Sequence, residues 1–146
     1  MKQKVRVKIL RENAVCPSYG SICAAGADLY AALESEIIIE PNKTEFIPTG
    51  IAMEIPDGFV GLVYARSGLA CKKGLAPANK VGVIDSDYRG EIMVALHNHS
   101  SEAVSVLKGD RIAQIVLTPY LTAEFEEYDD LSDTERAAGG FGSTGK

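Results

Sequence analysis

The chain has 146 residues, of which 24% are charged and 46% hydrophobic, and its net charge is −5. This length and balance predict one globular domain that buries a core without the help of disulfides or metals. Because the chain is acidic and has no basic cluster, we exclude an extended nucleic-acid surface, which leaves room for one anionic ligand held by a few arginines.

No segment predicts a signal peptide or a membrane span, because the N-terminus lacks an apolar core and no apolar run is long enough. The three cysteines, Cys16, Cys23 and Cys71, are odd in number and lack the paired spacing of a metal site. We expect them to be reduced thiols that pack inside a cytoplasmic protein.

Alternating apolar and basic side chains over residues 4–10 predict a half-buried strand. Short apolar runs separated by turn signals predict further strands at 36–40, 44–48, 51–55, 59–64, 92–99, 104–107, 111–117 and 123–128. One short helix is predicted over 67–73, with Ser67 as its N-cap and Gly74 at its end. Many short strands with a single helix indicate an all-β sandwich or barrel.

The stretch 79–91 is the most unusual, because it combines carboxylates, a tyrosine, an arginine, an amide and two glycines between strand-forming flanks. We predict that it forms the tip of a hairpin, with Ser86 and Asp87 in the turn. A solvated hairpin tip needs only one or two such polar residues, and that plainer interpretation stays open from this stretch alone.

Phosphate binding is predicted at two segments. Arg66, Ser67 and Gly68 stand at the start of the predicted helix, where an arginine fork and a hydroxyl can hold phosphate oxygens. An ordinary helix start with an exposed arginine is the alternative. The second segment, residues 142–145, is rich in glycine and hydroxyl groups, so its backbone amides can cradle phosphate, although it lacks the lysine spacing of a P-loop.

Asp28 and Asp85 are the candidate carboxylates for Mg²⁺ or for a water molecule, with local capping as the alternative for Asp28. Tyr88 and Phe141 are candidates for a base and sugar pocket, with core packing as the alternative. His97 and His99 have a spacing that zinc can use, but no further histidine supports a zinc site, and we expect surface residues of a strand.

In the tail from residue 129 onward apolar residues become fewer, and the chain ends in a glycine-rich run. By composition it is a flexible C-terminus, but Phe141 among glycines argues for a binding role, because this aromatic ring has no core of its own to join.

Five segments carry a resemblance to one family, and they occur in the family's order at matching length. They are residues 25–31, 66–70, 79–91, 109–114 and 136–145. On these segments the chain resembles the trimeric deoxyuridine triphosphatases. The resemblance implies a jelly-roll domain over 1–128, a C-terminal arm over 129–146, and a homotrimer with a site at each subunit boundary, which the arm of another subunit closes.

The resemblance also implies the reaction and its residues. Hydrolysis of dUTP to dUMP and pyrophosphate would keep uracil out of DNA and supply dUMP for thymidylate synthesis. It would use Mg²⁺, bound by Asp28 through water, and a water molecule oriented by Asp85 to attack the α-phosphorus, with Gln114 beside it. The residues expected to bind substrate are Arg66, Ser67, Gly68, Asn79, Val83, Tyr88, Arg136, Phe141, Gly142, Ser143 and Thr144.

Within that set, Tyr88 would pack under the deoxyribose and exclude a 2′-hydroxyl, while Asn79 and the backbone near Val83 would read the uracil edge. Phe141 would stack on uracil, and the other arm residues would bind the γ-phosphate. The chain departs from the family's usual pattern at Ala65, where proline or glycine is common, and at Ala137, where glycine is common.

Two other functions compete with this interpretation. A deoxycytidine triphosphate deaminase would share the fold and use a glutamate, for which Glu91 is available, but the intact segment 136–145 argues against it. A noncatalytic β-sandwich binding module would give no reason for Asp85, Arg66 and Gln114 to occur together with the arm.

Overall fold

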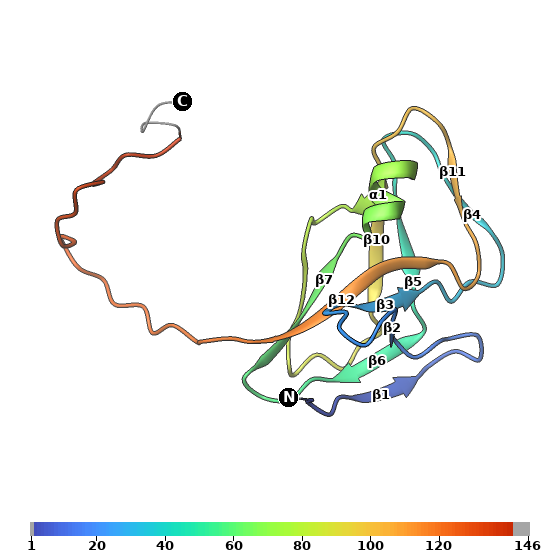
Figure 1. The fold of residues 1–146 in the computed structure, drawn as a ribbon, viewed down its shortest axis with the longest axis horizontal. Coiled ribbons are helices and arrows are strands. Elements are labelled where there is room, and N and C mark those ends of the chain that lie inside the picture. The colour runs from blue at the N-terminus through green and yellow to red at the C-terminus, as the bar shows by residue number, and fades with distance from the viewer. Residues whose placement is uncertain (1, 142–146) are drawn as a thin grey trace.

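Thirteen short elements, twelve strands and one helix, build the domain in the computed structural model, which describes residues 2–141 (Figure 1). The first seven strands are β1 (Arg6–Ile9), β2 (Ser18–Tyr19), β3 (Ala27–Tyr30), β4 (Ile37–Ile39), β5 (Thr44–Pro48), β6 (Ile51–Glu54) and β7 (Phe59–Tyr64). The helix α1 (Ser67–Lys73) follows, and then β8 (Leu75–Pro77), β9 (Gly82–Ile84), β10 (Met93–Asn98), β11 (Val104–Val106) and β12 (Arg111–Pro119).

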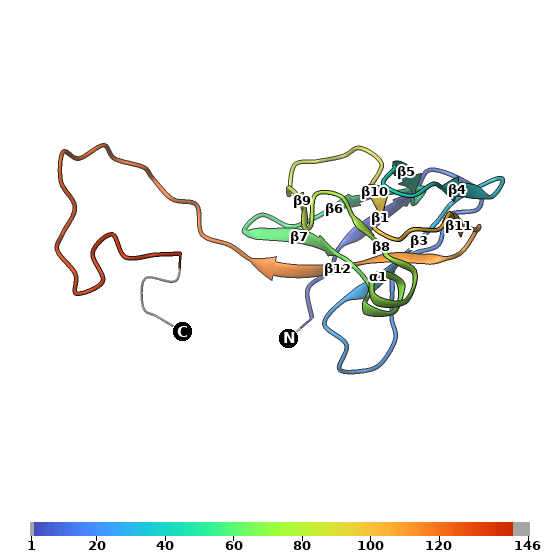
Figure 2. The same ribbon diagram turned by 90° about the horizontal axis from the view of Figure 1, so that it is seen from above.

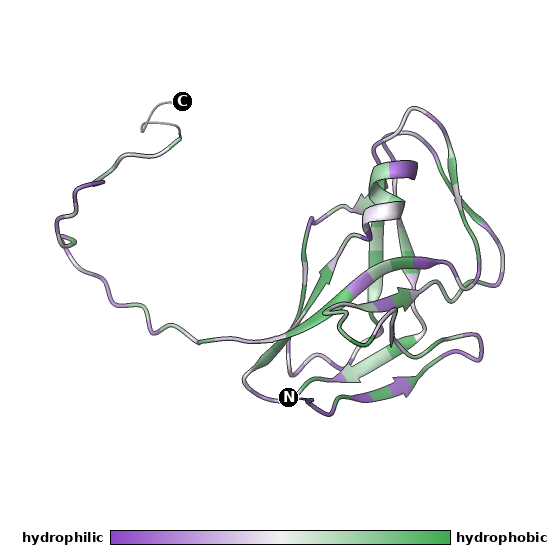
Figure 3. Cartoon of the chain, viewed as in Figure 1, coloured by the Kyte–Doolittle hydropathy of each residue, from purple (hydrophilic) through white to green (hydrophobic). Residues whose placement is uncertain are grey.

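The strands form four small antiparallel sheets. The largest has the order β2-β3-β12-β7-β9, and β5-β10-β8, β1-β6 and β11-β4 complete the domain. Leu29, Ile47, Leu75, Leu96 and Ile112 are almost completely buried in one core between these sheets. In Figure 3 the central strands β7, β10 and β12 carry long hydrophobic stretches, and hydrophilic residues recur in the connecting loops. The predicted all-β architecture with one helix is therefore confirmed.

The helix lies where the sequence places it, and it ends at Gly74, which has φ +70° and whose N–H donates to the carbonyl of Ala70 at 3.1 Å. Its N-cap is Arg66 rather than Ser67, and no side chain caps the first turn. No helix among residues 2–141 is long and apolar enough to cross a membrane.

The predicted hairpin over 79–91 is wrong. Residues Ser86 and Asp87 do form a turn, and the N–H of Tyr88 donates to the carbonyl of Asp85 at 3.2 Å. However, β9 pairs with β7 while β10 pairs with β5 and β8, so the turn connects two different sheets. Strand-forming flanks show that a turn joins two strands, but they do not show that those strands pair with each other.

The predicted strand over 123–128 is also absent. Within residues 2–141, the last backbone hydrogen bond that ties this end of the chain to the domain is donated by the N–H of Tyr120 to the carbonyl of Gly58 at 3.1 Å. From there residues 120–141, which we call the extended segment, leave the domain (Figures 1 and 2). Leu121 and Phe125 are fully exposed, because no strand among the described residues runs beside them.

Two smaller expectations about buried side chains also fail. Ile9 was expected on the buried face of the first strand, yet it is 49% exposed because β1 pairs only with β6 at the margin of the domain. Cys16, Cys23 and Cys71 are all exposed and free, so they are not packing residues.

Asn98 provides a test of the fold, because it is a fully buried polar residue. Its amide donates to the carbonyls of Ile39 (2.8 Å) and Glu102 (2.7 Å), and its oxygen accepts from the N–H of Ser100 (2.9 Å). We expect Asn98→Ala to lower the free energy of unfolding by about 2–4 kcal/mol, because it removes the hydrogen bond to the buried carbonyl of Ile39 and leaves a cavity at a fully buried position.

Urea unfolding followed by circular dichroism measures this change. Met93→Ala is the control, since Met93 lies on the same strand but is 41% exposed, and its loss is expected to cost less. Equal stability of Asn98→Ala and the parent chain would contradict the role given to this side chain.

Candidate active site

The centre of the site is the carboxylate of Asp28 on β3, which is only 7% exposed. Arg66 Nε donates to its Oδ1 at 2.7 Å, and Arg111 Nη1 lies 3.4 Å from its Oδ2. A carboxylate that is withdrawn from water needs such partners, and two guanidinium groups supply them here. Asp28 is therefore the point where β3, the segment after β7 and the start of β12 meet.

Strand register explains this convergence. Asp28 lies directly opposite Gln114 across the β3–β12 pair, and Gln114 lies opposite Tyr64 across the β12–β7 pair. Arg66 follows two residues after Tyr64, so it reaches the same end of the sheet. The structure thus brings together five of the residues predicted from sequence: Asp28, Arg66, Ser67, Gly68 and Gln114.

Arg111 is a partner of Asp28 that the sequence analysis did not assign. The register of β12 shifts between Arg111 and Ala113, and both Ile112 and Ala113 are buried. Such a bulge reverses which side chains face which side of a sheet, so Arg111 reaches the same carboxylate as the segment that carries Gln114. Strict alternation would have placed Arg111 on the opposite face, and no signal in the sequence marks the bulge.

A cavity of about 450 Å³ opens beside this cluster. Its lining consists of Gly20, Ala24, Gly26, Asp28, Arg66, Ser67, Gly68, Arg111 and Gln114. Gln114 Nε2 donates to the carbonyl of Ala65 at 2.9 Å, and a side chain at position 26 would collide with the Gln114 amide oxygen. Two arginines against one carboxylate leave the cavity with a net positive charge, which suits an anionic ligand.

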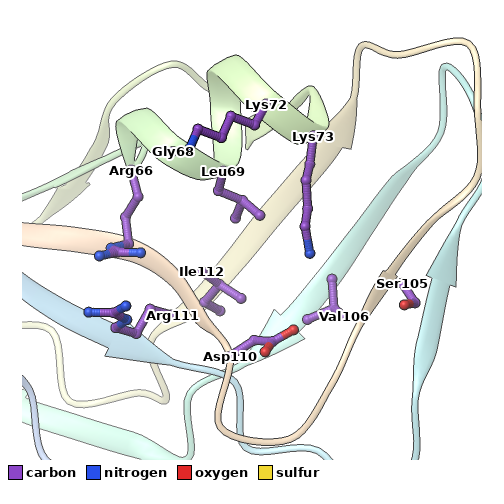
Figure 4. A pocket seen from close by; sticks show the side chains of 10 residues that line it. All are labelled: Arg66, Gly68, Leu69, Lys72, Lys73, Ser105, Val106, Asp110, Arg111 and Ile112. Atoms are coloured by element: carbon purple, nitrogen blue, oxygen red, sulfur yellow. The ribbon is translucent and has the colours of Figure 1, made fainter.

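A second cavity of about 300 Å³ adjoins the first and shares Arg66, Gly68 and Arg111 with it. Figure 4 shows the guanidinium groups of Arg66 and Arg111 facing each other below α1, with Lys72 and Lys73 on the helix above. Asp110 also lines this cavity, but its Oδ2 accepts from the N–H of Leu107 at 2.9 Å. The positive potential of the first cavity therefore continues under the helix.

The residues of the segment 79–91 lie elsewhere, and none of them lines the two cavities described above. Asn79, Val83 and Asp85 are partly or largely exposed, and Tyr88 is 44% exposed. The hydroxyl of Tyr88 donates to the carbonyl of Glu91 at 2.9 Å, and its ring lies so close to Gly90 that any side chain at position 90 would collide with it. The ring of Tyr88 is thus held over the backbone rather than packed in the core.

A bidentate ion pair holds the end of this segment, and the sequence analysis missed it. Arg11 Nε and Nη2 donate to the two carboxylate oxygens of Glu91 at 2.8 and 2.9 Å, and the N–H of Gly50 donates to the same carboxylate at 2.8 Å. These donors favour the ionised form, so they hold the pKa of Glu91 below its ordinary value, and the hydrogen bond from Arg11 is the largest cause. The pair spans 80 residues, so no local pattern reveals it.

The arm residues that the structure describes make no contact that would build a site. Arg136 Nε donates to the carbonyl of Gly139 at 2.7 Å, and Ala137 between them has φ +43°, in the left-handed region. Phe141 is fully exposed. Gly142, Ser143 and Thr144 lie outside the described residues. Within residues 2–141, no three histidine, cysteine, aspartate or glutamate side chains gather as a metal site.

Comparison with known proteins shows to which family the chain belongs. The family model for dUTPase matches residues 12–145. The chain belongs to the dUTPase family. A deoxyuridine 5′-triphosphate nucleotidohydrolase of Desulfitobacterium hafniense is 53% identical over 145 residues, which cover 97% of this chain and 96% of that protein.

Solved structures of this family are similar along the whole chain. The dUTPase of Staphylococcus bacteriophage 80alpha, solved with dUpNHpp, has a TM-score of 0.90 at 29% identity and covers 99% of this chain and 100% of its own. A mutant dUTPase of phage phi11 of S. aureus, described with a structural Mg(II) ion, has a TM-score of 0.81 at 25% identity and covers 90% of this chain and 100% of its own. The expected jelly-roll fold is confirmed by these likenesses.

The ion pair of Glu91 makes the stability of this dUTPase depend on pH. A carboxyl whose pKa is lowered on folding stabilises the protein above its unfolded pKa, near 4.5, and loses that effect as the pH falls through the folded value. We therefore expect Glu91→Gln to lower Tm by a few degrees at pH 7, and the difference from the parent chain to shrink below about pH 4.5.

Thermal unfolding between pH 3 and pH 7 measures this dependence. Glu54→Gln is the matched control, because Glu54 pairs with Arg6 at 3.2 Å through side chains that are 46% and 84% exposed, and such surface pairs contribute little. A difference for Glu91→Gln that stays constant down to pH 3 would argue against the ion pair as its cause.

Proposed function

We propose that the chain is a dUTP diphosphatase that hydrolyses dUTP to dUMP and pyrophosphate. The observation that carries this proposal is the positively charged cavity built by Arg66, Ser67, Arg111 and Gln114 around Asp28, in a chain of the dUTPase family. Its volume of about 450 Å³ lies in the range of small-molecule sites. The relative solved with dUpNHpp supports a nucleotide as the occupant.

Asp85 is our candidate for the residue that orients and deprotonates the attacking water. The carboxylate is exposed in a turn that carries Tyr88 beside it, so it is available to a water molecule at a subunit boundary. In this role Asp85 accepts a proton as the water oxygen attacks the α-phosphorus and pyrophosphate leaves. Gln114, fixed by its hydrogen bond to the carbonyl of Ala65, is proposed to position the phosphate and the water.

Arg66, Ser67 and Gly68 are proposed to bind the phosphate chain, and Arg111 adds a second guanidinium beside them. Phosphoryl transfer needs positioning and neutralisation of negative charge more than covalent help, and this set of side chains suits that need. Asn79, Val83 and Tyr88 are proposed to bind the uracil and deoxyribose. Arg136, Phe141, Gly142, Ser143 and Thr144 are proposed to close the site from the arm.

The residues around Asp28 suit magnesium only if the ion is held through water molecules. Both oxygens of Asp28 already interact with arginines, so we propose that Asp28 contacts the ion through water and that the substrate phosphates supply most of its ligands. The bound ion would neutralise charge on the triphosphate. The phage phi11 relative described with a structural Mg(II) ion supports magnesium as a partner of this family.

A homotrimer is proposed because the candidate residues of one chain lie in three separate regions rather than in one site. The cavity around Asp28, the turn with Asp85 and the described part of the arm are three separate exposed regions of the protomer. A site that takes one region from each of three chains would bring them together. In this proposal residues 1–128 form the domain, 129–146 form the arm, and the free thiols suit a cytoplasmic location.

The first test measures pyrophosphate release from dUTP with Mg²⁺, beside dCTP, dTTP and UTP. Release from dUTP alone, with dUMP as product, is expected. Asp85→Ala should lower turnover by roughly 10²–10⁴ if this carboxylate is the base. Near-normal turnover in Asp85→Ala would contradict its role.

The same assay separates the deaminase alternative, which predicts ammonia and a uracil nucleotide from dCTP. That alternative needs a glutamate available to substrate. In this chain the Glu91 carboxylate is already engaged by Arg11 and Gly50. We therefore expect no ammonia.

Mixed trimers test whether each site combines several chains. A chain with Asp85→Ala and a chain that ends at residue 135 should each be nearly inactive alone. When they exchange subunits, some sites receive an intact Asp85 and an intact arm, so the activity of the mixture should exceed the sum of the two.

The matched control mixes Asp85→Ala with Tyr88→Ala. Because both residues lie in one segment of one chain, every site receives at least one defect, and no recovery is expected. Recovery in the control, or its absence from the first mixture after subunit exchange is verified by mass spectrometry, would argue against sites built from several chains.

A further inference from the structure

The sequence has two histidines, His97 and His99, and the proposed function uses neither. They stand at the end of β10, where Asn98 between them is fully buried. Since side chains alternate along a strand, the two imidazoles share the outer face. Their ring centroids lie 4.4 Å apart, and the ring planes make an angle of 61°.

We propose that His97 and His99 form a two-imidazole chelate for a divalent transition-metal ion such as Ni²⁺, Cu²⁺ or Zn²⁺. Imidazole nitrogen is a ligand that these ions prefer, whereas Mg²⁺ prefers oxygen. The site is therefore distinct in chemistry from the magnesium proposed near Asp28. Water molecules complete the coordination, because residues 2–141 provide no third ligand of the usual kinds beside the pair.

The orientation of His97 suits a metal ligand. Its Nδ1 lies 2.8 Å from Thr44 Oγ1, on the neighbouring strand β5, and the two residues are direct partners in the sheet. When Nδ1 carries the proton and donates to this hydroxyl, the lone pair of Nε2 remains free for a metal. A second-shell hydrogen bond of this kind fixes both the tautomer and the direction of a ligating ring.

The backbone beneath the pair is held on both sides. His97 pairs with Thr44 on one side and with Ala76 of β8 on the other, and the N–H of His99 donates to the carbonyl of Gly74 at 2.8 Å. The buried amide of Asn98 fixes the turn that follows. A rigid backbone keeps the two rings close without the loss of chain freedom that a flexible pair would incur on binding.

The charge beside the pair also affects binding, because the cationic side chain of Lys80 acts on His99. Lys80 also repels a bound cation, which makes the site weaker than a closed structural site.

The experiment titrates Ni²⁺ into the untagged full-length protein without nucleotide and follows both imidazoles by ¹⁵N–¹H NMR. Ni²⁺ is the probe because the exposed thiols of Cys16, Cys23 and Cys71 would compete more strongly for Zn²⁺. With two histidines in the sequence, each ring signal can be assigned from one variant. We expect both signals to broaden together, and neither to respond to the same concentration of Mg²⁺.

Single variants test the chelate. His97→Gln and His99→Gln should each weaken Ni²⁺ binding by about tenfold or more, because the remaining imidazole no longer binds as half of a chelate. Lys80→Gln is the control, since it changes the local charge without removing a ligand, and it should bind Ni²⁺ as well as the parent chain or better. Binding that survives in both histidine variants, or broadening of one ring alone, would overturn the proposal.

Discussion

The buried charge of Asp28 is the constraint on which the site depends. A carboxylate that is 7% exposed is tolerated only with partners, and its partners here come from two distant segments, through Arg66 and Arg111. The ion pair with Arg66 connects β3 to the residues after β7, and the ion pair with Arg111 connects β3 to the bulge of β12. Loss of either arginine would leave a poorly compensated charge in the sheet, so the side chains that suit a phosphate ligand also hold the fold together at this end.

This arrangement gives an acidic protein a local positive field. The chain carries a net charge of −5, yet the two adjoining cavities are lined by Arg66, Arg111, Lys72 and Lys73. Clefts of one sign concentrate ligands of the opposite sign, even when the whole molecule has the same sign as the ligand. A polyanion that approaches the protomer is therefore drawn to the region below α1, while the rest of the surface repels it.

Sequence reasoning predicted most strands and the helix because their signals are local. The apolar run along 59–64 and the glycine after Lys73 each act within a few residues. It failed where the answer depends on partners far along the chain. The segment 79–91 has flanks that pair with β7, β5 and β8 rather than with each other, and residues 123–128 have a strand-like composition but no partner strand within the chain. The Arg11–Glu91 pair could not be predicted because its residues are 80 positions apart. The bulge that directs Arg111 could not be predicted because it interrupts the regular alternation of a strand.

Ala137 has a consequence for how often the arm adopts the turn in which it lies here. Its φ of +43° is a conformation that costs a residue with a side chain roughly 1–2 kcal/mol, whereas glycine adopts it readily. An arm with alanine there visits this turn roughly an order of magnitude less often than an arm with glycine. Any binding event that selects this turn must supply the difference, so a single methyl group makes the turn at Ala137 harder to form.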